Sequence, residues 1–218
     1  MKRQIVLFTN LDFGLRFIQT ILKFKKKYPC NYHTYKIYFS SKNINIKTKI
    51  KMTLTIMKAF KIIPSFVEDI NNQAWIKKRI IGCDTYGVVA GFNQIFKQST
   101  IDSFKVLINF HPSILPLYKG PSPVYWAIKY SESKIGYTIH YINDKIDEGT
   151  IIYQDAIDVE TDNHIEELYR LSKFAQSKFE EILLLLPNDK LIKRRYIDAN
   201  SIYQQRYRYI DSKGNITY

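Results

Sequence analysis

Short apolar runs alternate with amphipathic helical patterns through the first half of the chain, and this alternation leaves few folds open to it. The run at 4–9 (QIVLFT) is typical of a strand that is buried on both of its faces. Strands that alternate with helices predict an α/β fold, with a Rossmann-like, mostly parallel sheet and helices on both faces. The expected strands are 4–9, 35–39, 61–67, 86–90 and 104–109, and the expected helices are 11–27, 50–60 and 74–81.

Beyond residue 111 the pattern changes to a loop that is rich in proline and glycine. Pro121 or Pro123 begins a short helix after this loop, because proline is tolerated in a first helical turn. Two further strands, 135–142 and 150–157, follow this helix and are joined by a turn.

A long amphipathic helix and a β-hairpin are expected at the C-terminal end. Asn163 with Glu166 makes a capping pair at the start of the helix. The alternating tail 203–218, with a turn at 211–214, predicts the hairpin. We therefore expect a main domain over 1–187 and a C-terminal extension over 188–218, whose hairpin is a candidate element for a homodimer.

Composition excludes several classes of protein. Hydrophobic residues make up 45% of the chain and charged residues 24%, which is typical of a folded protein rather than a disordered one. No apolar run approaches the roughly 20 residues that a membrane span needs, and no signal-peptide core follows the basic start. The two cysteines form neither a CxxC pair nor a disulfide framework. We therefore expect a cytoplasmic protein with no membrane partner.

The net charge of +13 invites a nucleic-acid interpretation. Basic residues are spread from Lys2 to Lys213, however, and the chain is rich in Lys, Ile, Asn and Tyr together, as an AT-rich coding bias produces. The densest run, 23–27, has the position of a solvated helix end, where cations complement the helix dipole. Nucleic-acid binding is therefore not expected, and a non-catalytic nucleotide- or RNA-binding module is the alternative of another class.

His111 follows a buried strand, at the sheet edge where parallel α/β folds place their functional crevice. Asn109 lies two residues earlier, so both side chains can leave the strand on one face. An imidazole that handles a proton, beside an amide that stabilises an oxyanion, suits acyl-type chemistry. Asp147 is the favoured carboxylate to hold the imidazole, ahead of Asp144, because Gly149 permits close backbone approach. The alternative is that these acids merely cap a turn.

The other three histidines are weaker candidates for a catalytic role. His33 and His164 lie in polar, loop-like surroundings and are expected to face solvent. His140 lies inside a strand, where we expect a packing or supporting role. The histidines have neither HxxxH nor HxH spacing and no cysteine nearby, so no metal site is expected.

Four ordered motifs resemble those of the formyltransferase family, which transfers a formyl group from 10-formyltetrahydrofolate to an amine. The resemblance covers roughly 86–157, whereas the N-terminal half matches only in its rhythm of strands and helices. The motifs are N-x-H at 109–111, P-S-x-L-P at 112–116, G-x-T-x-H at 136–140 and D-x-G at 147–149.

The resemblance implies a role for each of the three polar residues. Asn109 would hydrogen-bond the formyl oxygen as it becomes an oxyanion. His111 would assist proton removal from the attacking amine, and Asp147 would orient His111 and relay a proton.

The resemblance also implies a folate site without metal, in which the backbone of 90–96 lines the pterin pocket and the turn 142–147 is the opposite wall. For Phe92 and Phe96 the alternative is ordinary core. The implied cofactor-binding residues are Phe92, Gln94, Phe96, Ile142, Asn143 and Asp144.

Three branches of the family differ in the amine that they formylate. The glycinamide ribonucleotide enzymes carry a glycine-rich phosphate loop after the first strand, where this chain has only Gly14 within 9–14. The methionyl-tRNA enzymes need an additional β-barrel domain, for which we expect no room. The small nucleotide-sugar N-formyltransferases pair the catalytic domain with a short C-terminal segment, which the expected helix and hairpin resemble.

We therefore expect a sugar N-formyltransferase that acts on a dTDP-linked 4-amino-4,6-dideoxyhexose, such as dTDP-4-amino-4,6-dideoxyglucose, for an O-antigen or similar surface polysaccharide. Lys119 and Trp126 are the candidate substrate-binding residues. Their alternatives are an exposed lysine and a tryptophan buried under the loop. A hydrolase that releases formate from the folate is a further alternative.

Overall fold

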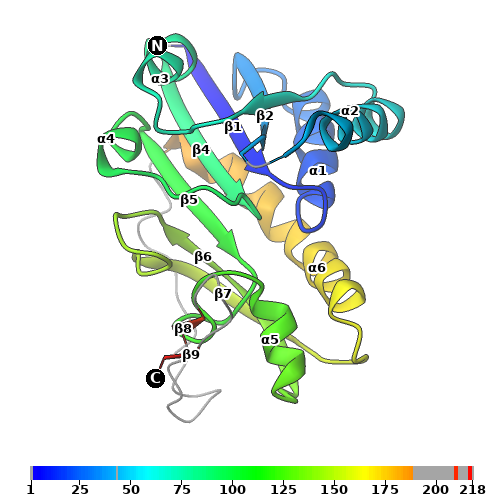
Figure 1. The fold of residues 1–218 in the computed structure, drawn as a ribbon. Coiled ribbons are helices and arrows are strands. Elements are labelled where there is room, and N and C mark those ends of the chain that lie inside the picture. The colour runs from blue at the N-terminus through cyan, green and yellow to red at the C-terminus, as the bar shows by residue number, and fades with distance from the viewer. Residues whose placement is uncertain (1, 43, 189–208, 211–215, 218) are drawn as a thin grey trace. The chain divides into compact units, whose positions relative to one another are not determined.

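The computed structural model describes residues 2–42, 44–188, 209–210 and 216–217 (Figure 1). The chain forms two compact units, Met1–Leu107 and Ile108–Tyr218. The division falls inside strand β5 (Val106–His111), a place that the sequence did not suggest. The boundary predicted between 187 and 188 stays a prediction, and 189–208 lie outside the described residues.

The first unit is built on four parallel strands in the order β3-β2-β1-β4. Side chains 4–9 of β1 are all buried, and successive side chains of a strand point to opposite faces, so both faces of β1 are covered. This arrangement confirms the predicted parallel α/β sheet. The strands are β1 (Arg3–Thr9), β2 (Thr34–Ser40), β3 (Ser65–Val67) and β4 (Asp84–Ala90).

Asparagine side chains cap two helices of the first unit, Asn45 at α2 and Asn72 at α3. Asn45 accepts a hydrogen bond from Thr48 N, which starts α2 four residues earlier than predicted. Asn10 accepts from Phe13 N and forms a turn, so α1 starts later than predicted. The predicted strand 61–67 is wrong in its first half, because Lys61 adopts a left-handed φ of 57° at the end of α2. The helices are α1 (Leu15–Lys27), α2 (Ile46–Phe60), α3 (Gln73–Arg79) and α4 (Gln98–Ile101).

The second unit pairs β5 with two antiparallel strands in the order β5-β6-β7. Its core includes Phe110 of β5, whose ring lies 6.1 Å from that of Tyr137 and 5.5 Å from that of Phe179. A β-bulge interrupts the pairing of β6 with β7 between Ile139 and His140. The remaining elements are β6 (Lys134–Tyr141), β7 (Ile151–Asp158), α5 (Pro123–Lys129), α6 (His164–Leu185) and a single 3₁₀ turn (Leu186–Asn188).

The start of α6 and the C-terminal strands agree with the structure that their sequence patterns predict. Asn163 accepts from Ile165 N at 3.0 Å and donates to Glu166 at 3.0 Å, which confirms the predicted capping pair. Strands β8 (Tyr209–Ile210) and β9 (Ile216–Thr217) pair antiparallel, as the predicted hairpin requires. The predicted turn at 211–214 lies outside the described residues. Across the described ranges, no helix combines the length and apolar character needed to cross a bilayer.

Glu167 is a fully buried carboxylate near the start of α6, and we expect Glu167→Ala to lower the free energy of unfolding by about 2–4 kcal/mol. One carboxylate oxygen accepts from the backbone N–H groups of Glu160 and Thr161, and the other accepts from Arg170 at 2.6 Å. The alanine leaves all three donors without this acceptor. Urea unfolding measures the loss. Glu166→Ala, at the exposed neighbouring position, is the matched control, and an equally small loss in both variants would contradict the prediction.

Candidate active site

The end of β5 presents two polar side chains on one face of the strand. Asn109 and His111 are two residues apart, and β6 places His140 and Thr138 opposite them. His111 is the last residue of the strand rather than the first residue after it, which corrects the expected boundary by a small margin. Its ring is buried, as is that of His140. The strand pairing therefore gathers four polar side chains of the second unit in one place.

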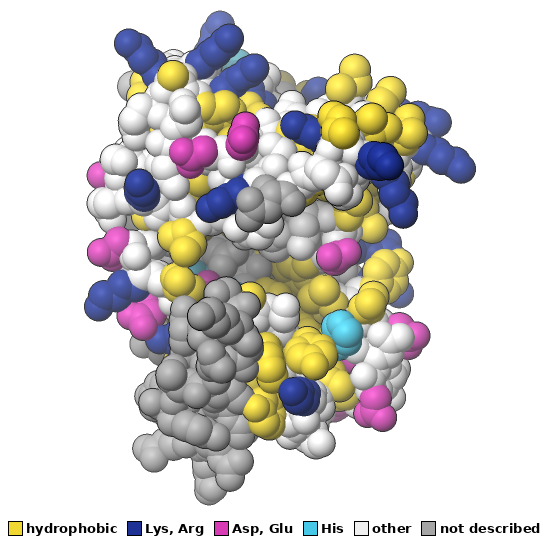
Figure 2. All heavy atoms as spheres, viewed as in Figure 1, with side chains coloured by type: hydrophobic (Ala, Val, Ile, Leu, Met, Phe, Trp, Pro, Cys, Tyr) yellow, Lys and Arg dark blue, Asp and Glu magenta, His cyan; other side chains and the backbone are white. Residues whose placement is uncertain are grey.

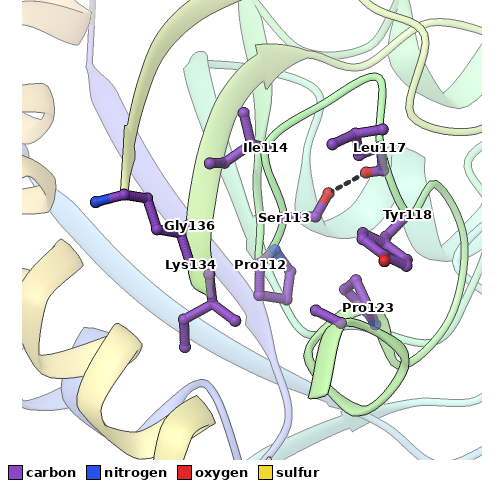
Figure 3. Close-up of a pocket in the computed structure, with 10 residues that line it drawn as sticks. Pro112, Ser113, Ile114, Leu117, Tyr118, Pro123, Lys134 and Gly136 are labelled. Atoms are coloured by element: carbon purple, nitrogen blue, oxygen red, sulfur yellow. Dashed lines mark hydrogen bonds between the residues drawn. The ribbon is translucent and has the colours of Figure 1, made fainter. Parts of the chain in front are cut away.

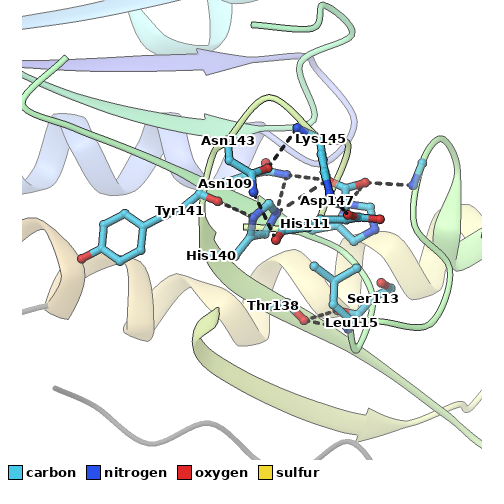
Figure 4. A network of polar contacts seen from close by, with 12 residues as sticks. Asn109, His111, Ser113, Leu115, Thr138, His140, Tyr141, Asn143, Lys145 and Asp147 are labelled. Atoms are coloured by element: carbon cyan, nitrogen blue, oxygen red, sulfur yellow. Dashed lines mark hydrogen bonds and ion pairs between the residues drawn. The ribbon is translucent and has the colours of Figure 1, made fainter. Parts of the chain in front are cut away.

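The turn between β6 and β7 brings a carboxylate to this face (Figure 4). Asp147 lies 3.4 Å from His111 Nδ1 and accepts from Asn109 Nδ2 at 3.3 Å and from Gly120 N at 2.8 Å. Asp147 thus contacts both of the other predicted residues, Asn109 and His111. Asp144, the other acid considered for this position, is exposed to solvent.

The backbone of the turn is shaped to deliver Asp147. Asp147 itself adopts a left-handed φ of 53°, which is uncommon for a residue with a side chain. A Cβ added at Gly149 would lie 1.6 Å from the carbonyl oxygen of Tyr141. Only glycine fits there without a shift of the backbone, so the close approach expected of Gly149 is present.

His111 is held in its neutral form. Burial lowers its pKa, and the Asp147 carboxylate and the Tyr118 carbonyl, which act in the opposite direction, do not restore it. Nε2 lies 2.9 Å from the Tyr118 carbonyl oxygen, closer than Nδ1 lies to Asp147. A carbonyl can only accept, so the shorter contact assigns the single proton to Nε2. Nδ1 is then the basic atom, and a proton taken there is stabilised by Asp147.

Asp147 is held ionised. Burial alone would raise its pKa, but the neighbouring imidazoles, His111 foremost and then His140, and the N–H of Gly120 outweigh burial. Together they hold the pKa of Asp147 well below its ordinary value. An ionised carboxylate beside a neutral imidazole is a suitable pair for accepting a proton.

His140 fixes the orientation of the Asn109 amide. His140 Nδ1 lies 2.8 Å from the carbonyl oxygen of Tyr141, so Nδ1 carries the proton and Nε2 accepts. Asn109 Nδ2 donates to His140 Nε2 at 3.2 Å and to Asp147 at 3.3 Å. Both N–H bonds of this amide are therefore used within the protein. To donate to a ligand, Asn109 has to exchange one of them.

The segment that carries these three side chains matches a known protein family. The family model described as formyl transferase matches residues 73–183, just over half of the chain. The chain belongs to the formyl transferase family. The match includes Asn109, His111 and Asp147.

Individual relatives of the family differ in their acceptors. Methionyl-tRNA formyltransferase of Geobacter sulfurreducens is 33% identical over 118 residues, which cover 53% of this chain and 37% of that protein. GDP-perosamine N-formyltransferase of Brucella melitensis is 38% identical over 80 residues, which cover 36% of this chain and 31% of that protein. The chain thus spans about a third of the length of these curated relatives.

Solved structures of formyltransferases share the fold. The sugar 3N-formyltransferase WlaRD, studied in the presence of dTDP and 5-N-formyl-THF, superposes with a TM-score of 0.65 at 20% identity. The superposition covers 98% of this chain and 71% of that one. Phosphoribosylglycinamide formyltransferases have similar folds too. At this level of identity the likeness establishes the formyltransferase fold alone.

A polar clamp that sequence reasoning missed holds the loop after His111. Thr138 accepts from Leu115 N and donates to Ser113 O, and Gln154 donates to Leu115 O at 2.7 Å. Alternate positions 136, 138 and 140 of the G-x-T-x-H motif share one face of a strand, and that spacing was the available signal. A small pocket lies under the same loop, beside the Ser113–Leu117 hydrogen bond, and the catalytic candidates do not line it (Figure 3).

The residues suggested for substrate already have protein partners. Lys119 forms a 2.8 Å ion pair with Glu148 and so ties the loop to the turn. Trp126 is half-buried, stacked on Tyr130, with Lys129 Nζ 4.7 Å from the centre of its ring. Their roles toward substrate stay predictions.

The folate residues on the turn between β6 and β7 differ in exposure. Asn143 shapes the turn, because it accepts from Lys145 N and donates to Glu148 O. Ile142 is half-buried, and Asp144 is exposed. Their roles toward folate stay predictions.

In the first unit, the side chains of the expected folate-binding residues contact other parts of the protein. Gln94 is buried, accepts from Ile70 N, and donates to Ser40 Oγ and Val67 O. The ring of Phe96 is buried 5.4 Å from that of Phe8, and Phe92 is half-buried in the same aromatic cluster. Any contact of Gln94 and Phe96 with folate is therefore expected through the backbone, as the resemblance implied.

The two remaining histidines lie outside this cluster. His33 is exposed, as expected, and accepts from Arg3 N. The expectation for His164 is wrong in part, because its ring is half-buried edge-on against Tyr125 at 5.1 Å. Within the described part of the chain, no three His, Cys, Asp or Glu side chains are grouped to hold a metal ion.

Proposed function

We propose that this chain is a sugar N-formyltransferase that moves the formyl group of 10-formyltetrahydrofolate to the amino group of a nucleotide-linked sugar. The convergence of Asn109, His111 and Asp147 in a member of the formyl transferase family carries the proposal. Formyl transfer to an amine needs a base, an oxyanion donor and a group that stabilises the protonated base. The three side chains supply these functions.

The proposed roles follow from the hydrogen bonds of the site. Asn109 exchanges its contact with Asp147 for the formyl oxygen, which becomes an oxyanion when the amine attacks the formyl carbon. Nδ1 of His111 takes the proton that the amine loses and is stabilised by Asp147. His111 returns this proton to N10 of the folate as the bond between N10 and the formyl carbon breaks. Acceptor and donor thus leave as formamide and tetrahydrofolate.

A nucleotide-linked amino sugar is the acceptor that we favour. GDP-perosamine N-formyltransferase is among the similar proteins, and WlaRD was studied with dTDP and a formyl folate. At Gly14 an added Cβ would lie 1.6 Å from Thr9 Oγ1, so local packing accounts for this glycine. A single glycine within 9–14 is a poor phosphate cradle, which disfavours glycinamide ribonucleotide. We take dTDP-4-amino-4,6-dideoxyglucose as the first acceptor to test, with O-antigen synthesis in the cytoplasm as its proposed setting.

The direct test is incubation of the protein with 10-formyltetrahydrofolate and a panel of acceptors, followed by mass spectrometry for the formyl increment. The panel contains dTDP- and GDP-linked amino sugars, glycinamide ribonucleotide and methionyl-tRNA. We expect the increment on a sugar. An increment only on one of the other two acceptors would replace the sugar assignment, and formate released without an acceptor would indicate a hydrolase.

His140 is proposed as a positioning residue, and His140→Ala is expected to lower kcat about tenfold with little change in either KM. The alanine frees the Asn109 amide to rotate, because its acceptor at 3.2 Å is lost. His140→Gln restores an acceptor at a similar reach and is expected to recover most of the lost kcat. Steady-state kinetics decide the matter. A change confined to KM, or no recovery with glutamine in a folded protein, would argue against this role.

The proposed homodimer rests on the hairpin of β8 and β9. Sedimentation equilibrium of the full chain measures its state. A monomer at micromolar concentration would remove this part of the proposal.

A further inference from the structure

Helix α2 exposes a row of large aliphatic side chains. Ile46, Ile50, Leu54 and Met57 are 69%, 53%, 63% and 41% exposed. Their spacing of four, four and three residues places them on one face of the helix. Ile56 is the buried side chain of α2, and it lies on another face. The row therefore protrudes instead of contributing to the core.

Lysines flank this row, and acidic residues are absent from it. Lys47, Lys51 and Lys58 follow the aliphatic row around the helix surface at helical spacing, and α2 contains no Asp or Glu. Figure 2 shows hydrophobic and basic side chains gathered at the upper right, where Figure 1 places α2.

The net charge of the chain concentrates in residues 13–67, a longer segment that includes α2. Residues 13–67 contain twelve Lys and Arg and no Asp or Glu, whereas the complete chain has a net charge of +13. The basic residues are thus spread along the chain, but the net charge is not. A coding bias acts along the whole sequence and does not explain this concentration.

We propose that α2 docks this protein peripherally on an anionic lipid bilayer, with Ile46, Ile50, Leu54 and Met57 inserted below the headgroups. A helix with an aliphatic face and a neighbouring row of lysines lies in such an interface, where lysines contact anionic headgroups while aliphatic side chains leave water. This association adds to the formyl transfer proposed above and does not depend on it. The expectation of no membrane partner rested on the absence of an apolar run long enough to span a bilayer. Peripheral docking needs no such run.

Other partners fit this surface less well. Nucleic acid would neutralise the lysines but leave the aliphatic row in water. A second copy of α2 would bring lysine rows of the same sign together. A protein partner needs a groove shaped for the protruding row, whereas a bilayer accepts it without a matching shape.

Vesicle co-sedimentation of the full chain tests the proposal. The probes are vesicles of phosphatidylcholine mixed with phosphatidylglycerol, and vesicles of phosphatidylcholine alone. We expect binding to the anionic vesicles and at least about tenfold weaker binding for the double variant Ile50→Ser/Leu54→Ser. Ile165→Ser/Lys173→Gln, at exposed positions of α6, is the matched control and is expected to bind like the unchanged protein.

Each result has a defined meaning. Weaker binding of Ile50→Ser/Leu54→Ser, with an unchanged melting temperature and circular dichroism spectrum, supports insertion of α2. Binding that salt abolishes but the serine variant retains would be adsorption by charge alone and would overturn the proposal. Absence of binding to anionic vesicles would overturn it too. Because the readout is lipid binding, it is independent of whether the protein formylates a sugar.

Discussion

Replacing His111 with alanine is expected to lower kcat for formyl transfer by about 10²–10⁴-fold, because removal of a general base usually costs this much. In the structure Nδ1 of His111 is the basic atom, and Asp147 lies 3.4 Å away to stabilise the proton that it takes. Kinetics at saturating folate and acceptor measure the loss. His33→Ala, at an exposed position in the first unit, is the control. A kcat within tenfold of the unchanged protein would remove His111 from the mechanism.

The pH profile gives a second, independent reading of His111. Its pKa is lowered by burial, so the imidazole remains neutral and basic to a lower pH than an exposed histidine with a pKa of about 6.5. kcat is therefore expected to be flat above neutral pH and to fall in acid, below the ordinary histidine range, as His111 gains its proton. A profile that falls only above neutral pH would show that the protonated imidazole is the active form.

Replacing Asp147 with asparagine is expected to lower kcat by a similar factor, about 10²–10⁴-fold. The Asp147 carboxylate accepts from Asn109 Nδ2 and Gly120 N and faces His111. An asparagine has one acceptor oxygen and must present an N–H group to one of these partners. The protonated imidazole also loses its counter-charge. Asp162→Asn, at an exposed position before α6 and outside the site, is the control and is expected to change kcat little.

The double variant His111→Ala/Asp147→Asn separates cooperation from independent effects. Because Asp147 is proposed to act through His111, the double variant is expected to be about as slow as His111→Ala alone. Fully multiplicative losses would mean that the two residues act separately. In that case Asp147 would have its own contact with substrate or would hold the loop at Gly120.

Features that depend on local sequence were predictable. The buried run at 4–9 identified β1, and Asn163 with Glu166 identified the start of α6, because each signal arises within a few residues. The predicted start of α2 at residue 50 is four residues late, because Asn45 caps the helix and its first residues, 46–48, are exposed. The strand over 61–67 failed because a left-handed residue at Lys61 ends the helix there.

The identity of the candidate catalytic residues was predictable from the sequence, whereas their hydrogen-bond partners were not. Spacing placed Asn109 and His111 on one face, and the glycine of the turn favoured Asp147. Contacts of the Tyr118 carbonyl with His111 and of His140 with Asn109 depend on how separate segments meet in space. Residue type therefore suggested an oxyanion donor at Asn109, whereas the structure shows that both of its N–H bonds are already engaged.

The register of β6 determines which side chains face Asn109 and His111, because Asn109 pairs with His140 and His111 pairs with Thr138. On the other edge of β6, Ile139 pairs with Tyr153 and His140 with Ile151, so the extra residue of the bulge lies on β7. Adding or deleting one residue in β6 would send Thr138 and His140 to the opposite face while leaving the number of paired residues nearly unchanged. An insertion or deletion in β6 is therefore expected to break the hydrogen bond between His140 and Asn109, whereas a substitution at an exposed position leaves the register intact.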